Sequence, residues 1–284
     1  MMNLASKILG LGCGAIGAND CTEDTAAHVV AIALEAGVRL FDAAPSYGYA
    51  EERLGRYLKP RRKEIWLSTK LGYGVPGVDE WTGPCITAGI ELALRRLHTD
   101  YLDIALLHSC SREVLLRDDI RWAFERAKRE GKVRFYGYSG EGSALQAALS
   151  VPEFDVLMAS LNLCDQRSID EVLPQLRGRL FLAKRPLANA PWRYPERPVG
   201  HYVETYWERW QAMALPDFGL DPSELALRFS AWHTGVANIV IGTANPSHLL
   251  QAVEWVSHGP LPGEVTSIIR TTFRNHDTHW TGQI

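Results

Sequence analysis

The sequence predicts a (β/α)8 barrel that forms a single domain over residues 1–284. Short apolar segments recur along the whole chain, and most are apolar throughout, as strands of a buried parallel sheet are. Amphipathic helical patterns lie between these segments. Eight strand–helix units within 284 residues fit one barrel better than two separate domains.

The predicted strands recur through the whole length of the chain, and most are apolar throughout. They cover residues 8–11, 38–41, 65–68, 104–107, 134–137, 156–159, 180–183 and 239–241. Helical spacing of apolar side chains is found in segments 86–97, 120–127, 225–232 and 249–256. Asp221 and Pro222 precede segment 225–232 and suit the N-cap and the first turn of a helix. Gly131 follows segment 120–127 and suits the end of that helix.

Four polar residues occur in order at the ends of the second, third and fourth strands. Asp42 and Tyr47 follow the second, Lys70 the third and His108 the fourth. Active sites of this fold lie at the carboxyl ends of the strands, and neighbouring strands are only about 4.8 Å apart. A tyrosine hydroxyl titrates near about 10, so it donates a proton poorly at neutral pH unless a nearby cation stabilises the phenolate.

These residue types can together activate a tyrosine as an acid. The Lys70 ammonium would stabilise the phenolate, the Asp42 carboxylate would hold the ammonium in place, and the His108 imidazole would steer the proton. Each residue alone has a plain structural interpretation, as a cap, a solvated charge or a packed histidine. An ordered set on three consecutive strands favours catalysis.

Two other enzyme classes fit the sequence less well. Residues 12–17 match GxGxxG and Asp42 ends the next strand, as in a dinucleotide-binding Rossmann unit. That unit needs a helix starting at the glycines, whereas the best cap for the following helix is Thr22. A metal-dependent barrel hydrolase would need a His-x-His after an early strand, and none of the nine histidines forms one. We therefore predict no metal site.

Composition narrows the partners and the compartment. The net charge of −3 and the lack of a basic run argue against a nucleic-acid partner. No apolar run is long enough for a membrane span. The five cysteines are scattered without a CxxC pair, which suits a reducing cytoplasm. The sequence does not indicate an oligomeric state.

The chain resembles the aldo-keto reductase family. The segment 37–48, GVRLFDAAPSYG, followed by Glu51 and Leu54-Gly55, resembles the first signature of that family. The five-residue step from Asp42 selects Tyr47 over Tyr49. The segments Ser68-Thr69-Lys70 and Leu106-Leu107-His108 supply the other two members of the family's tetrad.

The resemblance implies an NAD(P)-dependent oxidoreductase that interconverts an alcohol and a small carbonyl compound, which can be an aldehyde, a ketone or a sugar. Tyr47 would be the general acid in reduction, Lys70 paired with Asp42 would lower its pKa, and His108 would orient the carbonyl. The physiological substrate and the preferred direction stay open. An alternative is a cofactor-binding, redox-sensing partner subunit with little turnover.

The resemblance also implies where the cofactor binds, at the ends of strands one and five to eight. The expected contacts are Gly12, Ser139, Gly140, Met158, Lys184, Arg185, Pro186, Leu187, Gly242, Thr243, His248 and Gln251. Gly140 and Met158 stand where many members have Asn and Gln, and Lys184 stands where some have an aromatic residue. The Lys and Arg that often hold a 2′-phosphate are absent after the last strand. The cofactor usually bound in the family, and the positive charge of Arg185, still favour NADP(H) over NAD(H).

A long insertion follows the seventh strand. Residues 188–216 exceed the usual connection of about 2–6 residues and are rich in aromatics. Within it, 202–213 could form a short helix that presents Trp207 and Trp210. The segment could be a lid over the site or a strut that packs against neighbouring loops, and both remain open.

Overall fold

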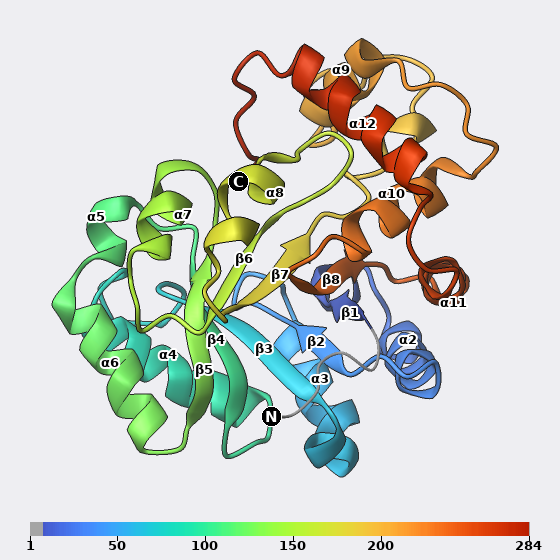
Figure 1. Ribbon diagram of the computed structural model, residues 1–284. Helices are drawn as coiled ribbons and strands as arrows, with labels where there is room; N and C mark the ends of the chain where they lie inside the picture. Colours follow the sequence, from blue (N-terminus) through green and yellow to red (C-terminus); the bar gives the residue numbers. More distant parts are fainter. Residues whose placement is uncertain (1–7, 284) are drawn as a thin grey trace.

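The computed structural model describes residues 8–283, which form a closed barrel of eight parallel strands surrounded by helices (Figure 1). Each strand pairs with the next in sequence, and the last pairs with the first. The strands are β1 (Leu9–Gly12), β2 (Leu40–Asp42), β3 (Trp66–Leu71), β4 (Leu102–His108), β5 (Val133–Ser139), β6 (Val156–Ser160), β7 (Leu180–Lys184) and β8 (Val236–Gly242). The predicted (β/α)8 fold is confirmed.

Most of the helices connect the strands and cover the outside of the barrel, whereas α9 (Glu204–Met213) and α12 (Gly263–His276) lie above the strand ends (Figure 1). The others are α1 (Gly14–Gly17), α2 (Glu23–Glu35), α3 (Ala50–Leu58), α4 (Gly83–Arg96), α5 (Arg112–Leu115), α6 (Asp118–Arg129), α7 (Gly142–Leu149), α8 (Arg167–Glu171), α10 (Pro222–Ala231) and α11 (Pro246–Ser257). Short 3-10 turns span Lys59–Glu64, Leu173–Gln175 and Pro191–Arg193. No described helix is long and apolar enough to cross a membrane.

The predicted caps form where the sequence places them. The Thr22 hydroxyl accepts a hydrogen bond from the backbone N–H of Thr25 at 3.1 Å, which starts α2. The Asp221 carboxylate accepts from the Ser223 N–H at 2.7 Å, which starts α10. The glycines of the GxGxxG segment form only the single turn α1 before Thr22. The long helix of a Rossmann unit therefore does not begin at these glycines.

The barrel interior is filled by alternate residues of the strands, because successive strand side chains point to opposite faces of a sheet. One buried cluster occupies this space: Leu40, Trp66, Ile104, Leu106, Val156, Met158, Leu182 and Val240. The residues between them, such as Phe41, Leu107 and Phe181, belong to a second cluster shared with the helices. This alternation decides which strand-end side chains reach the site.

The long insertion after β7 lies over the carboxyl-terminal end of the barrel. Its helix α9 packs beside α12, and both stand above the strand ends at the top of Figure 1. The helix predicted at 202–213 is confirmed as Glu204–Met213. The Arg209 guanidinium, buried on this helix, donates to the Cys164 carbonyl at 3.2 Å and to the Thr281 carbonyl at 2.6 Å. These contacts fix the insertion to the loop after β6 and to the C-terminal segment.

Candidate active site

A cavity of about 530 Å³ opens at the carboxyl ends of the strands. All four catalytic candidates, Asp42, Tyr47, Lys70 and His108, line it. Three of them lie within their strands rather than in the loops that follow: Asp42 ends β2, Lys70 is the penultimate residue of β3, and His108 ends β4. Counting back by two from each reaches an interior residue, for example Leu40 below Asp42 and Leu106 below His108. Inward alternation thus delivers these polar side chains to one cavity.

Asp42 and Lys70 form a buried ion pair at the base of the cavity. The Lys70 ammonium donates to Asp42 Oδ2 at 2.5 Å and to the Ala43 carbonyl at 2.9 Å. The Ser68 hydroxyl donates to the other Asp42 oxygen at 2.8 Å. Burial alone would lower the pKa of Lys70, but the charge of the neighbouring Asp42 carboxylate and the hydrogen bond to it raise the pKa above its usual value. Lys70 is therefore a permanent cation at neutral pH.

Tyr47 lies directly over this cation. The Lys70 nitrogen is 5.0 Å from the centroid of the Tyr47 ring. Tyr49, by contrast, is 55% exposed and is not part of the cavity wall. Of these two tyrosines, Tyr47 is therefore the one that lines the cavity.

Two glycines bring the Tyr47 loop against the loop that follows β1. The Tyr49 N–H donates to the Gly17 carbonyl at 2.8 Å. A Cβ on Gly17 would lie 1.9 Å from the Tyr47 carbonyl oxygen, so no larger residue fits there without a shift of the backbone. Gly48 has φ +54° and a Cβ on it would lie 2.3 Å from the Gly17 oxygen. The backbone around Tyr47 is thus held by direct contact between the two loops.

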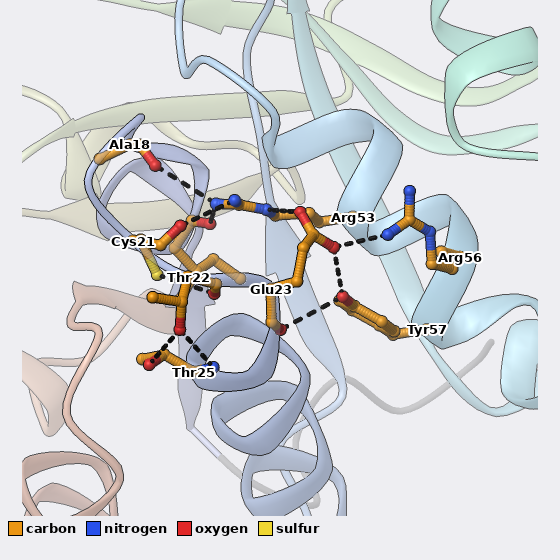
Figure 2. A network of polar contacts seen from close by, with 9 residues as sticks. Ala18, Cys21, Thr22, Glu23, Thr25, Arg53, Arg56 and Tyr57 are labelled. Atoms are coloured by element: carbon orange, nitrogen blue, oxygen red, sulfur yellow. Dashed lines mark hydrogen bonds and ion pairs between the residues drawn. The ribbon is translucent and has the colours of Figure 1, made fainter.

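Arg53 of α3 also holds the β1 loop, through polar contacts that Figure 2 shows. Its guanidinium donates to the carbonyls of Ile16 at 2.5 Å and Cys21 at 2.8 Å, and to Glu23 Oε1 at 2.7 Å. Arg53 is buried, whereas Arg56, which also binds Glu23, is mostly exposed. Because α3 follows the Tyr47 loop directly, Arg53 fixes the β1 and β2 loops relative to each other.

His108 lies in the cavity wall with one ring nitrogen engaged. Its Nδ1 is 2.7 Å from the Tyr73 hydroxyl, which is in turn 2.8 Å from the Ser46 hydroxyl. Burial, followed by the charges of Lys70, Lys184 and Arg185, lowers the pKa of His108 to about 3. The imidazole is therefore neutral at neutral pH. Tyr73 was not identified from the sequence.

The expected cofactor contacts also converge on this cavity. Except for Gly140, every one of them lines it. Sheet register explains part of this result, since His108 pairs with Ser139, Ser139 pairs with Met158, and Gly12 pairs with Gly242. At Gly140 a Cβ would lie 2.2 Å from the Tyr138 hydroxyl. The packing of Tyr138 thus accounts for a glycine at position 140.

Two buried side-chain atoms in the cavity wall have no hydrogen-bond partner among the described residues. They are the Ser139 hydroxyl and the Asn189 side-chain amide nitrogen. Asn189 was not identified from the sequence. It lies in a left-handed turn, where Ala188, Asn189 and Ala190 have φ values of 48°, 59° and 55°. Left-handed backbone is strained for residues other than glycine and is concentrated at ligand sites.

Positive charge lines the β7 side of the cavity. Lys184 lies 3.2 Å from the buried Glu141 carboxylate. Arg185 is held by the hydroxyl of Tyr202 at 2.7 Å, by Ser160 at 3.1 Å and by the Gln283 carbonyl. These two cations are therefore already partnered within the protein.

Arg193, from the insertion, differs from both of these cations. It is exposed and lines the cavity, and no ion pair or hydrogen bond engages its guanidinium among residues 8–283. His248 and Gln251 of α11 line the same cavity, as does Thr243 just before that helix. A helix N-terminus favours an anion, and Arg193 adds an unpaired cation to the wall of the same cavity.

The aromatic loops contribute less to the cavity than their composition suggests. Among the described residues, Trp81, Trp207 and Trp210 do not line it, whereas Tyr202 does. The Trp207 indole donates to the Tyr194 carbonyl at 2.9 Å, and Trp210 packs edge-on against Trp192. These two tryptophans hold the insertion together from within.

The sequence model of the Aldo/keto reductase family matches residues 8–272. L-galactose dehydrogenase from Arabidopsis thaliana is 32% identical in an alignment that covers 89% of this chain and 85% of that protein. D-threo-aldose 1-dehydrogenase from Pseudomonas sp is 27% identical in an alignment that covers 89% of this chain and 90% of that protein.

The fold comparison agrees with the sequence comparison. The holo form of aldo-keto reductase AKR11C1 from Bacillus halodurans superposes with a TM-score of 0.83 at 26% identity, covering 95% of each chain. Together with the family match over nearly the whole chain, this likeness settles the relationship. The chain belongs to the aldo/keto reductase family of oxidoreductases.

Proposed function

We propose that the protein is an NAD(P)-dependent oxidoreductase that interconverts a small carbonyl compound and the corresponding alcohol, with Tyr47 as the proton donor in reduction. The observation that carries this proposal is the buried Asp42–Lys70 pair directly beneath Tyr47, in the same cavity as His108. A permanent cation below a phenol stabilises the phenolate that remains after proton donation.

The proposed roles follow from the contacts of each residue. Asp42 keeps the Lys70 ammonium in place, and Ser68 and the Ala43 carbonyl fix the orientation of the pair. The neutral His108 imidazole can donate a hydrogen bond to the carbonyl oxygen, which polarises the carbonyl and orients it toward Tyr47. In the oxidation direction, the Tyr47 phenolate would accept the alcohol proton.

The polar groups of the cavity wall that have no partner in the described part of the chain suit a nicotinamide cofactor. When bound, the cofactor supplies or takes up the hydride at the carbonyl carbon. The Ser139 hydroxyl, at the strand ends beside His108, suits the carboxamide. The Asn189 side-chain amide suits the diphosphate, because its nitrogen has no partner among residues 8–283 and offers N–H donors. We assign Arg193, with the start of α11, to the 2′-phosphate, which favours NADP(H).

The substrate is proposed to be an aldehyde, ketone or sugar. Two relatives bear the names of aldose and galactose dehydrogenases. The cavity wall also carries polar groups, such as Tyr202 and Lys184, that can hydrogen-bond to sugar hydroxyls. We therefore place sugars beside simple aldehydes as the substrate classes to examine.

The substitution Tyr47→Phe tests the proton donor. We expect a loss of turnover of at least about 10²-fold, the usual scale for a lost general acid, with cofactor affinity retained. Tyr49→Phe is the matched control, because it removes an exposed hydroxyl two residues away. Near-full activity in Tyr47→Phe, or an equal loss in Tyr49→Phe, would overturn the assignment.

A further inference from the structure

We propose that Tyr73 is a positioning residue that fixes the His108 imidazole with its proton on Nε2. The inference rests on the proposed function for its catalytic consequence, although the state of the ring can be measured independently of turnover. It begins with the contact between the Tyr73 hydroxyl and His108 Nδ1 at 2.7 Å.

The direction of this hydrogen bond follows from the chemistry of its partners. A neutral imidazole carries one N–H and one bare nitrogen that accepts strongly. A phenol is a better donor than an aliphatic hydroxyl and a poorer acceptor. The arrangement that uses each group best has Ser46 donating to Tyr73 and Tyr73 donating to Nδ1, over the observed 2.8 and 2.7 Å. The single ring proton then resides on Nε2.

This tautomer is the one that carbonyl reduction needs. A carbonyl oxygen only accepts hydrogen bonds, so it is attracted by an Nε2–H group and repelled by the lone pair of a bare Nε2. His108 lines the cavity while its Nδ1 is occupied by Tyr73. The ring nitrogen left for a ligand is therefore Nε2.

The loop around Tyr73 is built to hold this phenol. The centroid of the Trp81 ring lies 5.7 Å from that of the Tyr73 ring. The backbone N–H of Trp81 donates to the Gly72 carbonyl at 2.7 Å. Gly72 has φ +121°, and a Cβ there would lie 2.4 Å from the Trp81 ring. Ser46 precedes Tyr47 in the chain. Tyr73 consequently links the loop that carries Tyr47, the proposed acid, to His108, the proposed hydrogen-bond donor to the substrate carbonyl.

Nitrogen NMR of the His108 ring in the ligand-free protein tests the inference. In the wild type, we expect protonation at Nε2 around neutral pH. In Tyr73→Phe, which keeps the ring and removes the hydroxyl, we expect both tautomers to be populated. Tyr49→Phe should leave the His108 signals unchanged. Protonation at Nδ1 in the wild type, or unchanged signals in Tyr73→Phe, would overturn the inference.

Kinetics then separates this inference from the proposed function. We expect kcat/KM for carbonyl reduction to fall roughly three- to tenfold in Tyr73→Phe, the scale of one neutral hydrogen bond, with the cofactor Kd unchanged. An inactive wild type whose tautomer still depends on Tyr73 would remove the proposed function and keep the inference. A kinetic loss without a change in tautomer would contradict the inference. If Tyr73→Phe does not fold, Ser46→Ala provides a second test, and we expect it to weaken the preference of the His108 proton for Nε2. An unchanged tautomer in Ser46→Ala would then overturn the inference.

Discussion

The two sides of the cavity are built differently. On the β2–β4 side, Asp42 and Lys70 are buried strand residues held by hydrogen bonds within the barrel. On the β7–β8 side, the wall consists of a left-handed turn, an exposed Arg193 and an insertion fixed to distant segments. The first side places a few groups rigidly, and the second offers unpartnered groups such as Asn189.

This difference teaches how the proposed chemistry is divided. Acid catalysis needs fixed distances between a phenol and a cation, which the buried end of β3 and the tightly packed Tyr47 loop provide. Binding of a cofactor and a substrate needs donors that are free until the ligand arrives, which long loops can provide. Substitutions on the β2–β4 side should therefore reduce turnover, and those on the β7–β8 side should change affinity.

The largest effect is expected from Lys70→Met, which removes the cation below Tyr47 and keeps much of the side-chain stem. The phenolate loses its stabilising charge and Asp42 loses its partner, so turnover should fall by at least about 10²-fold. Lys132→Met, which disrupts a surface ion pair with Glu91 and Glu130, is the matched control. An unchanged pH–rate profile in Lys70→Met would contradict the role assigned to the cation.

Arg53→Met tests whether the β1 and β2 loops depend on the buried guanidinium. Loss of its charged hydrogen bonds should lower the free energy of unfolding by about 1.5–3 kcal/mol, and the carbonyls of Ile16 and Cys21 would lose their donor. Arg56→Met removes an exposed partner of the same Glu23 and should cost at most about 1 kcal/mol. Equal losses in chemical denaturation would show that burial of Arg53 is irrelevant.

On the β7–β8 side, Arg193→Met should weaken NADPH binding by about tenfold, because a charge-assisted contact to phosphate is lost. NADH binding should change less, since NADH lacks the 2′-phosphate. Arg197→Met is a suitable control because Arg197 is already paired with Glu204 and Glu208. Dissociation constants from fluorescence titration decide the matter, and an equal effect on both cofactors would remove Arg193 from the 2′-phosphate site.

The smallest effects should separate a lid from a strut within the insertion. Tyr202→Phe removes a hydroxyl at the cavity and should raise the KM for carbonyl substrate by roughly two- to tenfold. Trp207→Phe removes the indole hydrogen bond to Tyr194 and should lower only the melting temperature. A change of substrate ranking in Trp207→Phe, with none in Tyr202→Phe, would reverse these roles.

The positions of the candidate residues on the β2–β4 side could be predicted from the sequence, because these residues lie at the ends of neighbouring strands. Once eight strands are recognised, the alternation of side chains and the short strand-to-site distances leave little freedom for Asp42, Lys70 and His108. The observed strands extend slightly beyond their predicted ends, because the Asp42–Lys70 ion pair lets both polar residues lie within strands.

The β7–β8 side and Tyr73 were less accessible from sequence. The left-handed turn contains Ala188 and Ala190 rather than glycine, so nothing in its composition indicated that backbone. Arg193 lies in an insertion whose path depends on tertiary contacts. Tyr73 did have a signal, since it stands between Gly72 and Gly74 directly after β3, where a tight turn can return a side chain to the site.

The most direct test of the central claim is a coupled measurement of cofactor oxidation and alcohol formation. Purified protein would be incubated with NADPH or NADH and a panel of aldehydes, ketones and sugars, with alcohol quantified alongside the absorbance of the reduced cofactor. The proposed function predicts that at least one carbonyl is reduced with one alcohol formed per cofactor oxidised, and that Tyr47→Phe abolishes both signals together. Tight cofactor binding without turnover on the whole panel, or in the reverse direction with sugars and alcohols, would contradict it.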